Sequence, residues 1–450
     1  MTYGVRWDWY KNSAPALTEG PTQLAPTRNV TFPAAQGVDW KDWTPRSALV
    51  YDLFGNGRTA LKASLNKYLA SELDPPFSFS GAIPTFANPS GDNQLVETTT
   101  RSWTDSNHNY TPDCNLLNPL VNGECGAMVN PNFGGVNSNQ QAFDSSVTNG
   151  YGFREYNWEF STGVQQQIAP RIAAELNYFR RWYGNFPVTN NLALTPSSYS
   201  PFCVTAPTSD PRLSTAGQSI CGFLNINQAQ FSAVPDYLVT LSSKYGNQIQ
   251  HWNGVDFNIT GRPRGGLLLQ GGVDTGYTLT DNCQVLANAP AIAPTELPYC
   301  RVQTPWLTQI KGSASYPVPK IDVQVAASFQ SLPGPEVDAN YVATSAQVQS
   351  SLGRPLSGGA ANVTVNVVPP MSQFGQRLNQ LDFRVAKMFK FAKTRTLINF
   401  DVYNALNANA VLAQNNTIGG APLADGASSW QRPQQILVAR FVKFSVQFDF

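Results

Sequence analysis

The stretch ARFVKFSVQFDF, Ala439 to Phe450, decides the fold class. Its polar residues, such as Lys443 and Gln447, alternate with apolar ones. The apolar set is Val438, Val442, Phe444, Val446, Phe448 and Phe450. A period of two places these two kinds of side chain on opposite faces of a β-strand. Because chain ends are usually polar and loosely held, an apolar face carried to the last residue predicts that a protein core or lipid covers this end.

The first ten residues, MTYGVRWDWY, follow the same alternation, with Tyr3, Val5, Trp7 and Trp9 on one face. This segment has no basic region, apolar core or small-residue cleavage site, so it is not a signal peptide. It reads as a strand from the start. A chain that opens inside a strand is expected to lack its beginning.

Composition narrows the class of protein further. Only 13% of the 450 residues are charged, against roughly 25% in ordinary soluble proteins. The net charge of +1 gives no overall electrostatic signature for binding nucleic acid or anionic lipid heads. No stretch approaches the ~20 consecutive apolar residues of a spanning helix. A membrane β-barrel remains compatible, because its alternating strands keep mean hydropathy low.

Two kinds of connection separate the alternating segments. Five are short reversals, among them Gly55-Asn56-Gly57 and Ala169-Pro170-Arg171, which carry the residues of tight turns. Six are long, polar and without a sustained period: 11–43, 72–155, 187–249, 282–304, 335–377 and 409–433. Short and long connections alternate, which predicts an antiparallel meander of twelve strands with all long loops at one end. An outer-membrane barrel, with short periplasmic turns and long external loops, has this arrangement.

Alternation alone leaves one other fold open. The strands near 157–168, 321–330 and 381–391 each carry one apolar and one polar face. A soluble β-sandwich would show the same pattern, with its apolar face turned inward. The corresponding alternative function is a secreted all-β carbohydrate-binding or adhesive protein. The loop asymmetry, the strand lengths and the terminal Phe450 favour the barrel.

Several phrases carry a family resemblance: Thr44–Leu69, Ser102–Gly126, Asn379–Phe391, Ile398–Asn416 and the closing strand Ala439–Phe450. They resemble the C-terminal barrel of TonB-dependent outer-membrane receptors. The subgroup that is most similar carries a carboxypeptidase-regulatory-like domain at its N-terminus. The resemblance spans essentially all 450 residues and is loose in the loops.

The resemblance implies that residues 1–450 form one partial barrel domain. Transporters of this kind are 22-stranded barrels with a plugged lumen, so these strands would be the eleventh to the last. The plug, the energy-coupling box and the first ten strands would be absent. The implied location is the outer membrane, and the implied function is uptake of an unidentified nutrient, either oligosaccharide or peptide.

The same resemblance implies the partners. They are outer-membrane lipid, the nutrient and the barrel-assembly machinery, which would read Phe448 and Phe450 as an assembly signal. An inner-membrane TonB-type energy coupler would act only through the missing plug. Nucleic acid is not expected.

The sequence contains few residues or motifs that could support catalysis. The two histidines, His108 and His251, fall in separate predicted loops, and no GxSxG, HExxH or phosphate-binding loop motif occurs. We therefore predict that the chain is not an enzyme.

The six cysteines fall two by two in three of the long loops, and their spacing is too wide for metal thiolates. The predicted disulfides are Cys114–Cys125, Cys203–Cys221 and Cys283–Cys300. Loops outside the cell lie in an oxidising space in which disulfides persist. None of the six is predicted to lie in a strand.

Beside the first pair, TDSNHNYTPD spaces oxygen ligands as a calcium loop does. The predicted Ca²⁺ set is Asp105, Asn107, Asn109, the backbone carbonyl of Thr111, and Asp113. Tyr110 replaces the usual glycine and Leu116 the usual bidentate glutamate. An Asx-rich turn without metal is the alternative.

Other polar and aromatic residues complete the candidates. The loop aromatics Trp103, Tyr110, Tyr199 and Trp430 could stack on sugars or anchor the membrane interface. The predicted lumen-facing residues are Glu159, Glu175, Asp256, Asp274, Asp382, Arg384 and Asp401. The sequence does not identify the residues that bind the substrate.

Overall fold

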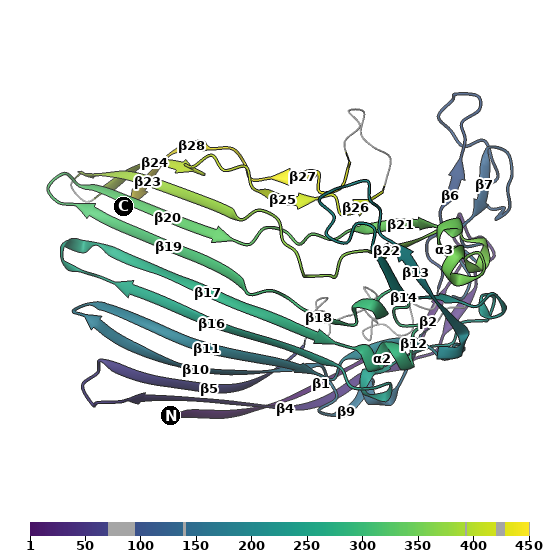
Figure 1. Cartoon of the computed structure of the whole chain (residues 1–450), viewed down its shortest axis with the longest axis horizontal. Helices are drawn as coiled ribbons and strands as arrows, with labels where there is room; N and C mark the ends of the chain where they lie inside the picture. The colour runs from purple at the N-terminus through teal and green to yellow at the C-terminus, as the bar shows by residue number, and fades with distance from the viewer. Residues whose placement is uncertain (71–94, 138–140, 392–393, 420–427, 450) are drawn as a thin grey trace.

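The computed structural model describes residues 1–70, 95–137, 141–391, 394–419 and 428–449. Its main element is a curved sheet of long antiparallel strands (Figure 1). In sheet order these are β1 (Thr2–Ala14), β4 (Ala35–Asp52), β5 (Thr59–Leu69), β10 (Tyr156–Ala169), β11 (Ile172–Gly184), β16 (Ile249–Gly261), β17 (Leu268–Asp281), β19 (Leu307–Val318), β20 (Val323–Leu332), β23 (Leu378–Phe391), β24 (Thr394–Tyr403) and β28 (Phe441–Asp449). The predicted meander of twelve strands is confirmed.

The alternation of short and long connections is confirmed as well. All five short connections lie at one end of the sheet, which we call the turn end, and the six long ones lie at the loop end (Figure 1). Between β4 and β5, Gly55 and Gly57 adopt φ values of 65° and 69°. Such left-handed backbone is costly for residues with a Cβ, which explains the glycines of this hairpin.

The predicted bounds of the first long loop, 11–43, are wrong. β1 runs on to Ala14 and β4 begins at Ala35, and the two remain paired past a bulge at Lys11. The extension is stabilised because Val38 and Trp40 are buried, and the Trp40 indole donates a hydrogen bond to the Val147 carbonyl. Tertiary packing thus continues the ribbon where the polar sequence indicated a loop.

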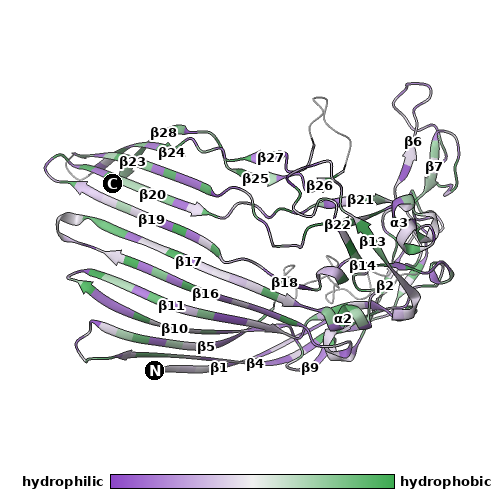
Figure 2. Cartoon of the chain, viewed as in Figure 1, coloured by the Kyte–Doolittle hydropathy of each residue, from purple (hydrophilic) through white to green (hydrophobic). Residues whose placement is uncertain are grey.

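The two faces of the sheet differ in polarity, as the alternating bands along the strands in Figure 2 show. The apolar face exposes its side chains: Phe444 is 74% exposed and Val446 53%. The alternate residues Lys443 and Ser445 belong to the opposite, polar face. A single sheet whose apolar face lies open needs an apolar surrounding, which a lipid bilayer supplies.

Smaller elements build the loop end. The added strands form the pairs β2 (Leu17–Glu19) and β3 (Val30–Phe32), β6 (Arg101–Trp103) and β7 (Cys125–Met128), β13 (Tyr199–Thr205) and β14 (Ser219–Ile226), and β25 (Val411–Gln414) and β27 (Pro433–Ile436). Two three-stranded sheets join β12 (Pro187–Asn191), β15 (Tyr237–Leu241) and β8 (Gln141–Phe143), and β22 (Asn362–Asn366), β21 (Asn340–Thr344) and β26 (Thr417–Ile418). At the border of the main sheet, β9 (Asn149–Tyr151) pairs with β4 and β18 (Arg301–Gln303) with β17. The helices α1 (Ser145–Thr148), α2 (Cys283–Asn288) and α3 (Ser345–Leu352) are short. No helix in the described ranges is long and apolar enough to cross a membrane.

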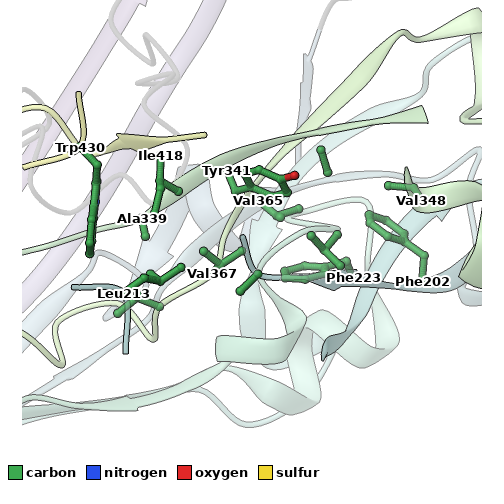
Figure 3. Packing of buried hydrophobic residues seen from close by; sticks show 14 of the residues in the cluster. Phe202, Leu213, Phe223, Ala339, Tyr341, Val348, Val365, Val367, Ile418 and Trp430 are labelled. Carbon is green, nitrogen blue, oxygen red and sulfur yellow. The ribbon is translucent and has the colours of Figure 1, made fainter. Parts of the chain in front are cut away.

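The largest buried cluster, which we call the loop core, lies among these connections (Figure 3). It joins Phe202 and Phe223 of the 187–249 connection, Val367 of 335–377, and Ile418 and Trp430 of 409–433. The Trp430 indole donates to the Asp338 carbonyl at 2.7 Å. The sequence did not predict this core, because its apolar residues are scattered singly through polar connections.

Candidate functional site

The polar face of the sheet is the main candidate site. In its centre Asp256 of β16 lies directly opposite Asp274 of β17, and Asn177 of β11 is the next residue in the same row. One oxygen of Asp256, Oδ2, accepts a hydrogen bond from the Asn258 amide at 2.5 Å. Like charges directly opposite each other destabilise a sheet, so this row favours a positively charged or strongly hydrogen-bonding guest.

Beside that row the polar face is hollowed by about 640 Å³. Glu175, Asp274 and Asp382 line the hollow together with Lys311. Gly271, Gly272 and Gly312 also line it, and Gly272 makes room on the polar face, because it lies in the row of Asn258 and Lys311 and brings no side chain. A Cβ on Gly272 would lie 2.1 Å from the Asn258 amide oxygen, so no larger residue fits this position without rearrangement.

The charged residues around the hollow are held by neighbours. Lys62 lies 3.0 Å from the Glu175 carboxylate, and the Gln380 amide donates to both oxygens of Asp382 at 2.9 and 3.0 Å. Two further ion pairs, Arg181–Glu159 and Arg384–Asp401, flank the hollow on the same face. The hollow can therefore hold a polar solute by hydrogen bonds and by its net negative charge.

The structure places the predicted lumen-facing residues unequally. Glu175, Asp274 and Asp382 line the hollow, and Asp256 lies beside it in the register. Glu159, Arg384 and Asp401 are engaged in ion pairs instead. Lys311 and the three glycines were not among the predicted residues. Their signal in the sequence was the small-residue run GGVDTG (271–276) paired with KGSAS (311–315).

The predicted position of His251 in a loop is wrong. It lies in β16, on the apolar face, 3.5 Å from the Arg180 guanidinium. β16 begins at Ile249, and its pairing with β11 reaches His251, which lies opposite Trp182. His108 lies beside the loop that the Cys114–Cys125 bond closes, distant in sequence from His251. The two histidines therefore belong to different parts of the fold.

The first disulfide closes a compact loop in which the predicted calcium residues gather. Asp113 accepts hydrogen bonds from the side-chain amides of Asn107 and Asn109 at 2.5 and 2.9 Å. Asp105 accepts from the backbone N–H groups of Asn109 and Tyr110. The Asn109 side-chain oxygen accepts from the Thr111 N–H. These contacts are those of an Asx-rich turn, and in the described ranges no group of three or more His, Cys, Asp or Glu side chains is arranged to hold a metal ion.

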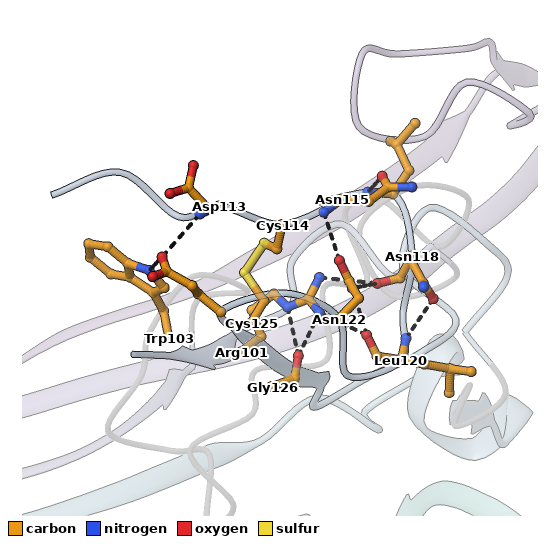
Figure 4. The surroundings of a disulfide bond; sticks show 12 residues. Arg101, Trp103, Asp113, Cys114, Asn115, Asn118, Leu120, Asn122, Cys125 and Gly126 are labelled. Atoms are coloured by element: carbon orange, nitrogen blue, oxygen red, sulfur yellow. Dashed lines mark hydrogen bonds between the residues drawn. A yellow bond between two sulfur atoms is a disulfide. The ribbon is translucent and has the colours of Figure 1, made fainter. Parts of the chain in front are cut away.

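Glu124 organises this loop and was missed by the sequence analysis. Its carboxylate accepts hydrogen bonds from the Trp103 indole and the Asp113 N–H (Figure 4). It also accepts from the hydroxyl and the N–H of Ser106. The Ser106 hydroxyl contributes most to lowering the pKa of Glu124, which falls to about 2. Its signal was only its place next to Cys125, because no spacing rule joins residue 124 to residue 106.

The cysteines are joined as Cys114–Cys125, Cys203–Cys221 and Cys283–Cys300, the three pairs that the sequence predicts. The prediction that none lies in a strand is wrong. Cys125 begins β7, Cys203 lies in β13, and Cys221 lies opposite it in β14. Each long connection has short strands of its own, and one disulfide, Cys203–Cys221, joins two of them.

The loop aromatics have different roles. Tyr110 is 86% exposed and Trp103 is 42% exposed, so both remain available for stacking. Trp430 is buried in the loop core, where the Arg212 guanidinium lies 5.5 Å from its ring centroid. Trp430 therefore cannot contact a sugar, and the prediction that included it is wrong on this point.

A second group of aromatics lies on the apolar face at the loop end. Three cross-strand pairs recur along the sheet: Trp7 with Trp43, Trp158 with Trp182, and Tyr277 with Trp306. Their ring centroids are 5.1 to 6.3 Å apart. Rows of Trp and Tyr at one level of an apolar face are typical of the membrane–water interface of a barrel.

The chain was compared with family models, curated proteins and solved structures. No family model and no curated protein matches the chain. The outer membrane transporter YddB from Escherichia coli is similar over 99% of this chain, with 10% identity and a TM-score of 0.43. The ferric-catecholate import receptor Fiu from Escherichia coli K12 is similar over 99%, with 11% identity and a TM-score of 0.40. The FrpB iron transporter from Neisseria meningitidis (F5-1 variant) is similar over 99%, with 10% identity and a TM-score of 0.41.

These neighbours are TonB-dependent outer-membrane receptors, the family that the sequence resembles. The chain spans only about half of their length: 50% of YddB, 42% of Fiu and 42% of FrpB.

Proposed function

We propose that this chain is part of the barrel of a TonB-dependent outer-membrane receptor that takes up a nutrient through its polar face. The observation that carries the proposal is the distribution of apolar side chains. In the sheet, apolar side chains such as Phe444 and Val446 are exposed along one face. In the long connections, by contrast, apolar side chains are buried in the loop core. Lipid would cover the exposed face, and water and solute would contact the polar one.

The alternative β-sandwich receives no such support. A sandwich buries the apolar face of each sheet against a second sheet. Here Phe257, Ile310 and Phe329 of the central strands are all between 38% and 44% exposed. A secreted binding protein with this surface would aggregate in water.

The nutrient class follows from the hollow. Asp256 and Asp274 favour a solute with a cationic group, and Lys311 with the Gln330 and Gln380 amides offers hydrogen bonds. A peptide fits this chemistry better than a neutral oligosaccharide, so we propose a peptide or another cationic solute.

The proposal also includes further parts of a receptor. Within the described residues β1 pairs only with β4, and β28 only with β24. Further strands at these two edges would close the barrel, and a plug in its lumen would connect it to an inner-membrane energy coupler. A carboxypeptidase-regulatory-like domain would precede that plug.

Barrel assembly is proposed to depend on the closing strand. Phe448 lies on the apolar face and is 60% exposed, while Phe450 lies outside the described residues. Deletion of Phe450 in the full-length parent is expected to lower its amount in the outer membrane sharply. Unchanged amounts of the deletion variant in the outer membrane would contradict a role of Phe450 in assembly.

Membrane location is tested first. The full chain, expressed with an export signal, is expected to sediment with outer membranes, to need detergent for extraction, and to migrate differently on a gel before and after heating. A soluble monomer would contradict the proposal. Uptake of labelled peptides by cells with the full-length parent then tests the nutrient class, with Asp256→Asn and Asp274→Asn expected to lower uptake of cationic peptides more than of neutral ones.

A further inference from the structure

Three arginines gather at the turn end of the polar face. Arg58 ends the hairpin before β5, Arg171 precedes β11, and Arg262 follows β16. The Arg262 N–H donates to the Arg171 carbonyl at 2.9 Å, and the Gln167 N–H donates to the Arg58 carbonyl at 2.7 Å. β5, β10, β11 and β16 are successive neighbours in the sheet, and neighbouring strands are spaced by about 4.8 Å. The three backbones therefore fall within roughly 14 Å of one another.

These arginines line one hollow of about 730 Å³, which we call the arginine hollow. No carboxylate lines it, and in the described part of the chain none of the three guanidinium groups has an ion-pair or hydrogen-bond partner. Guanidinium groups bind carboxylates and similar anions through paired hydrogen bonds. The arginine hollow is therefore suited to an anionic group of a solute that contacts the polar face.

The arginine hollow adjoins the 640 Å³ hollow in the centre of the polar face. Thr260 of β16 and Gln270 of β17 line both hollows and lie opposite each other in the register. Along β16, Arg262 lies six residues beyond Asp256, whose partner across the strands is Asp274. At about 3.3 Å per residue, the carboxylate row and the arginines are roughly 20 Å apart. The polar face thus carries a negative and a positive region on one continuous surface.

The negative region has an acceptor without a donor. Oδ1 of Asp256 is buried and has no hydrogen-bond partner among the described residues. Because the Asp274 carboxylate lies directly opposite, a positively charged donor would both satisfy this oxygen and offset the repulsion between the two carboxylates. An ammonium group meets both needs, since it carries a positive charge and three N–H donors.

We propose that the polar face binds a peptide with both termini free, its ammonium group at Asp256 and Asp274 and its terminal carboxylate in the arginine hollow. An extended chain spans at most ~3.3–3.6 Å per residue, so a peptide of about six residues reaches from one region to the other. Thr260 and Gln270 lie between the two regions and offer hydrogen bonds to the peptide backbone. This inference rests on the proposed function, uptake of a peptide through the polar face.

The experiment uses the full chain in detergent micelles and three hexapeptides of Gly and Ser with a fluorescent label on a central cysteine. One hexapeptide has both termini free, one has an amidated carboxyl terminus, and one has an acetylated amino terminus. Fluorescence anisotropy gives the Kd of each. We expect the peptide with two free termini to bind about tenfold or more tightly than either blocked form, because each blocked form loses charge-assisted hydrogen bonds at one end. A dipeptide with free termini is too short to contact both regions and is expected to bind no better than the blocked forms.

Two variants separate the two ends of the peptide. Arg58→Gln/Arg171→Gln/Arg262→Gln is expected to abolish the preference for a free carboxylate and to keep the preference for a free amino terminus. Asp256→Asn/Asp274→Asn is expected to have the opposite effect. All three arginines are exposed, so their replacement is expected to leave the fold intact.

The matched control is Lys320→Gln/Lys390→Gln/Arg395→Gln. Lys320 lies in the turn between β19 and β20, Lys390 near the end of β23 and Arg395 near the start of β24. The control removes the same charge at the turn end, but its residues line neither hollow. We expect it to keep both preferences.

Four outcomes would overturn the inference: equal binding of the free and the amidated peptide, loss of both preferences in the arginine variant, loss of the carboxylate preference in the control, or tighter binding of an amino-acetylated acidic peptide than of the peptide with free termini. The last outcome would assign the arginine hollow to an acidic segment of a protein instead.

Sedimentation with outer membranes separates this inference from the proposed function. A chain that is soluble without detergent contradicts both. A chain that sediments with the membrane and binds peptides without regard to their carboxyl terminus contradicts only the assignment of the arginine hollow.

Discussion

Glu124 holds the disulfide loop together through one exposed carboxylate. Its pKa is lowered to about 2 because the Ser106 hydroxyl and N–H and the Trp103 indole donate hydrogen bonds to the ionised form. A group with a lowered pKa stabilises the fold above its ordinary pKa, here 4.5, and loses this contribution as the pH falls toward the folded value.

We therefore expect the Trp103 indole N–H resonance to stay constant down to about pH 4 and to shift with a midpoint near pH 2. Glu124→Gln keeps the shape but not the charge, and is expected to abolish the transition. A midpoint near the ordinary pKa of a glutamate would contradict the hydrogen-bonded arrangement.

The Cys114–Cys125 bond is expected to stabilise this loop more than calcium does. Closing a loop of this length contributes roughly 3 kcal/mol in the chain-entropy model. External calcium sites bind only at about 10⁻⁴–10⁻³ M, so calcium would contribute only while bound. Reduction should therefore weaken calcium binding, measured by calorimetry on the oxidised and the reduced chain.

Asp113→Asn serves as the control variant, because it leaves the disulfide in place and removes one predicted calcium ligand. No calcium-dependent heat at millimolar concentration would leave only an Asx-rich turn. Peptide mapping without reduction checks the bond itself, and Cys114 alkylated as a free thiol would refute it.

Local sequence predicted part of this loop and missed the rest for a physical reason. The spacing of Asp105, Asn107 and Asn109 predicted a cluster of oxygens, and the loop positions of the cysteines predicted their pairing. The role of Glu124 could not be predicted, because its partners Ser106 and Trp103 come close to it only after the chain has folded back. Gly123 is the residue that permits this approach: its φ is 53°, and an added Cβ would lie 2.1 Å from the Asp113 carbonyl oxygen.

At the scale of elements, the strands were predictable and the loop core was not. In a strand such as β10, apolar and polar residues alternate, so the alternation in the sequence is enough to predict the strand. Phe202 and Phe223 of the loop core stand instead in short strands that pack on α3 and on distant connections. Their burial depends on residues far along the chain, such as Val367, and no local period records that contact.

Phe223→Ala tests the loop core. Phe223 is fully buried, and removing a buried phenylalanine ring typically costs about 3–5 kcal/mol. We expect faster hydrogen exchange and easier proteolysis in 199–226 and 335–368, with little change in the long strands. Phe444→Ala is the matched control, because its ring lies on the exposed apolar face and is expected to leave the loops protected. Equal loosening in both variants would contradict an independent loop core.

At the scale of the whole molecule, the two open edges of the sheet are expected to determine the oligomeric state of the isolated chain. Unpaired backbone groups that face lipid cost several kcal/mol each, and within the described ranges β1 and β28 each pair on one side alone. We expect the isolated chain in detergent to aggregate, to form dimers, or to close imperfectly. Size-exclusion chromatography with light scattering measures this. A monodisperse monomer whose amides are protected from exchange along both edges would be the contrary result.

The loop core also dictates an order of events during biogenesis. Arg212 and Trp430 meet in it although 218 positions separate them in sequence. Contacts of such long range form slowly, because the intervening chain must first be brought together. The connection that carries Trp430 lies between β24 and β28, the last two strands of the meander. We therefore expect the loop core to be completed only after β24 and the connection that follows it have been synthesised, and Phe202 and Phe223 to remain exposed until then.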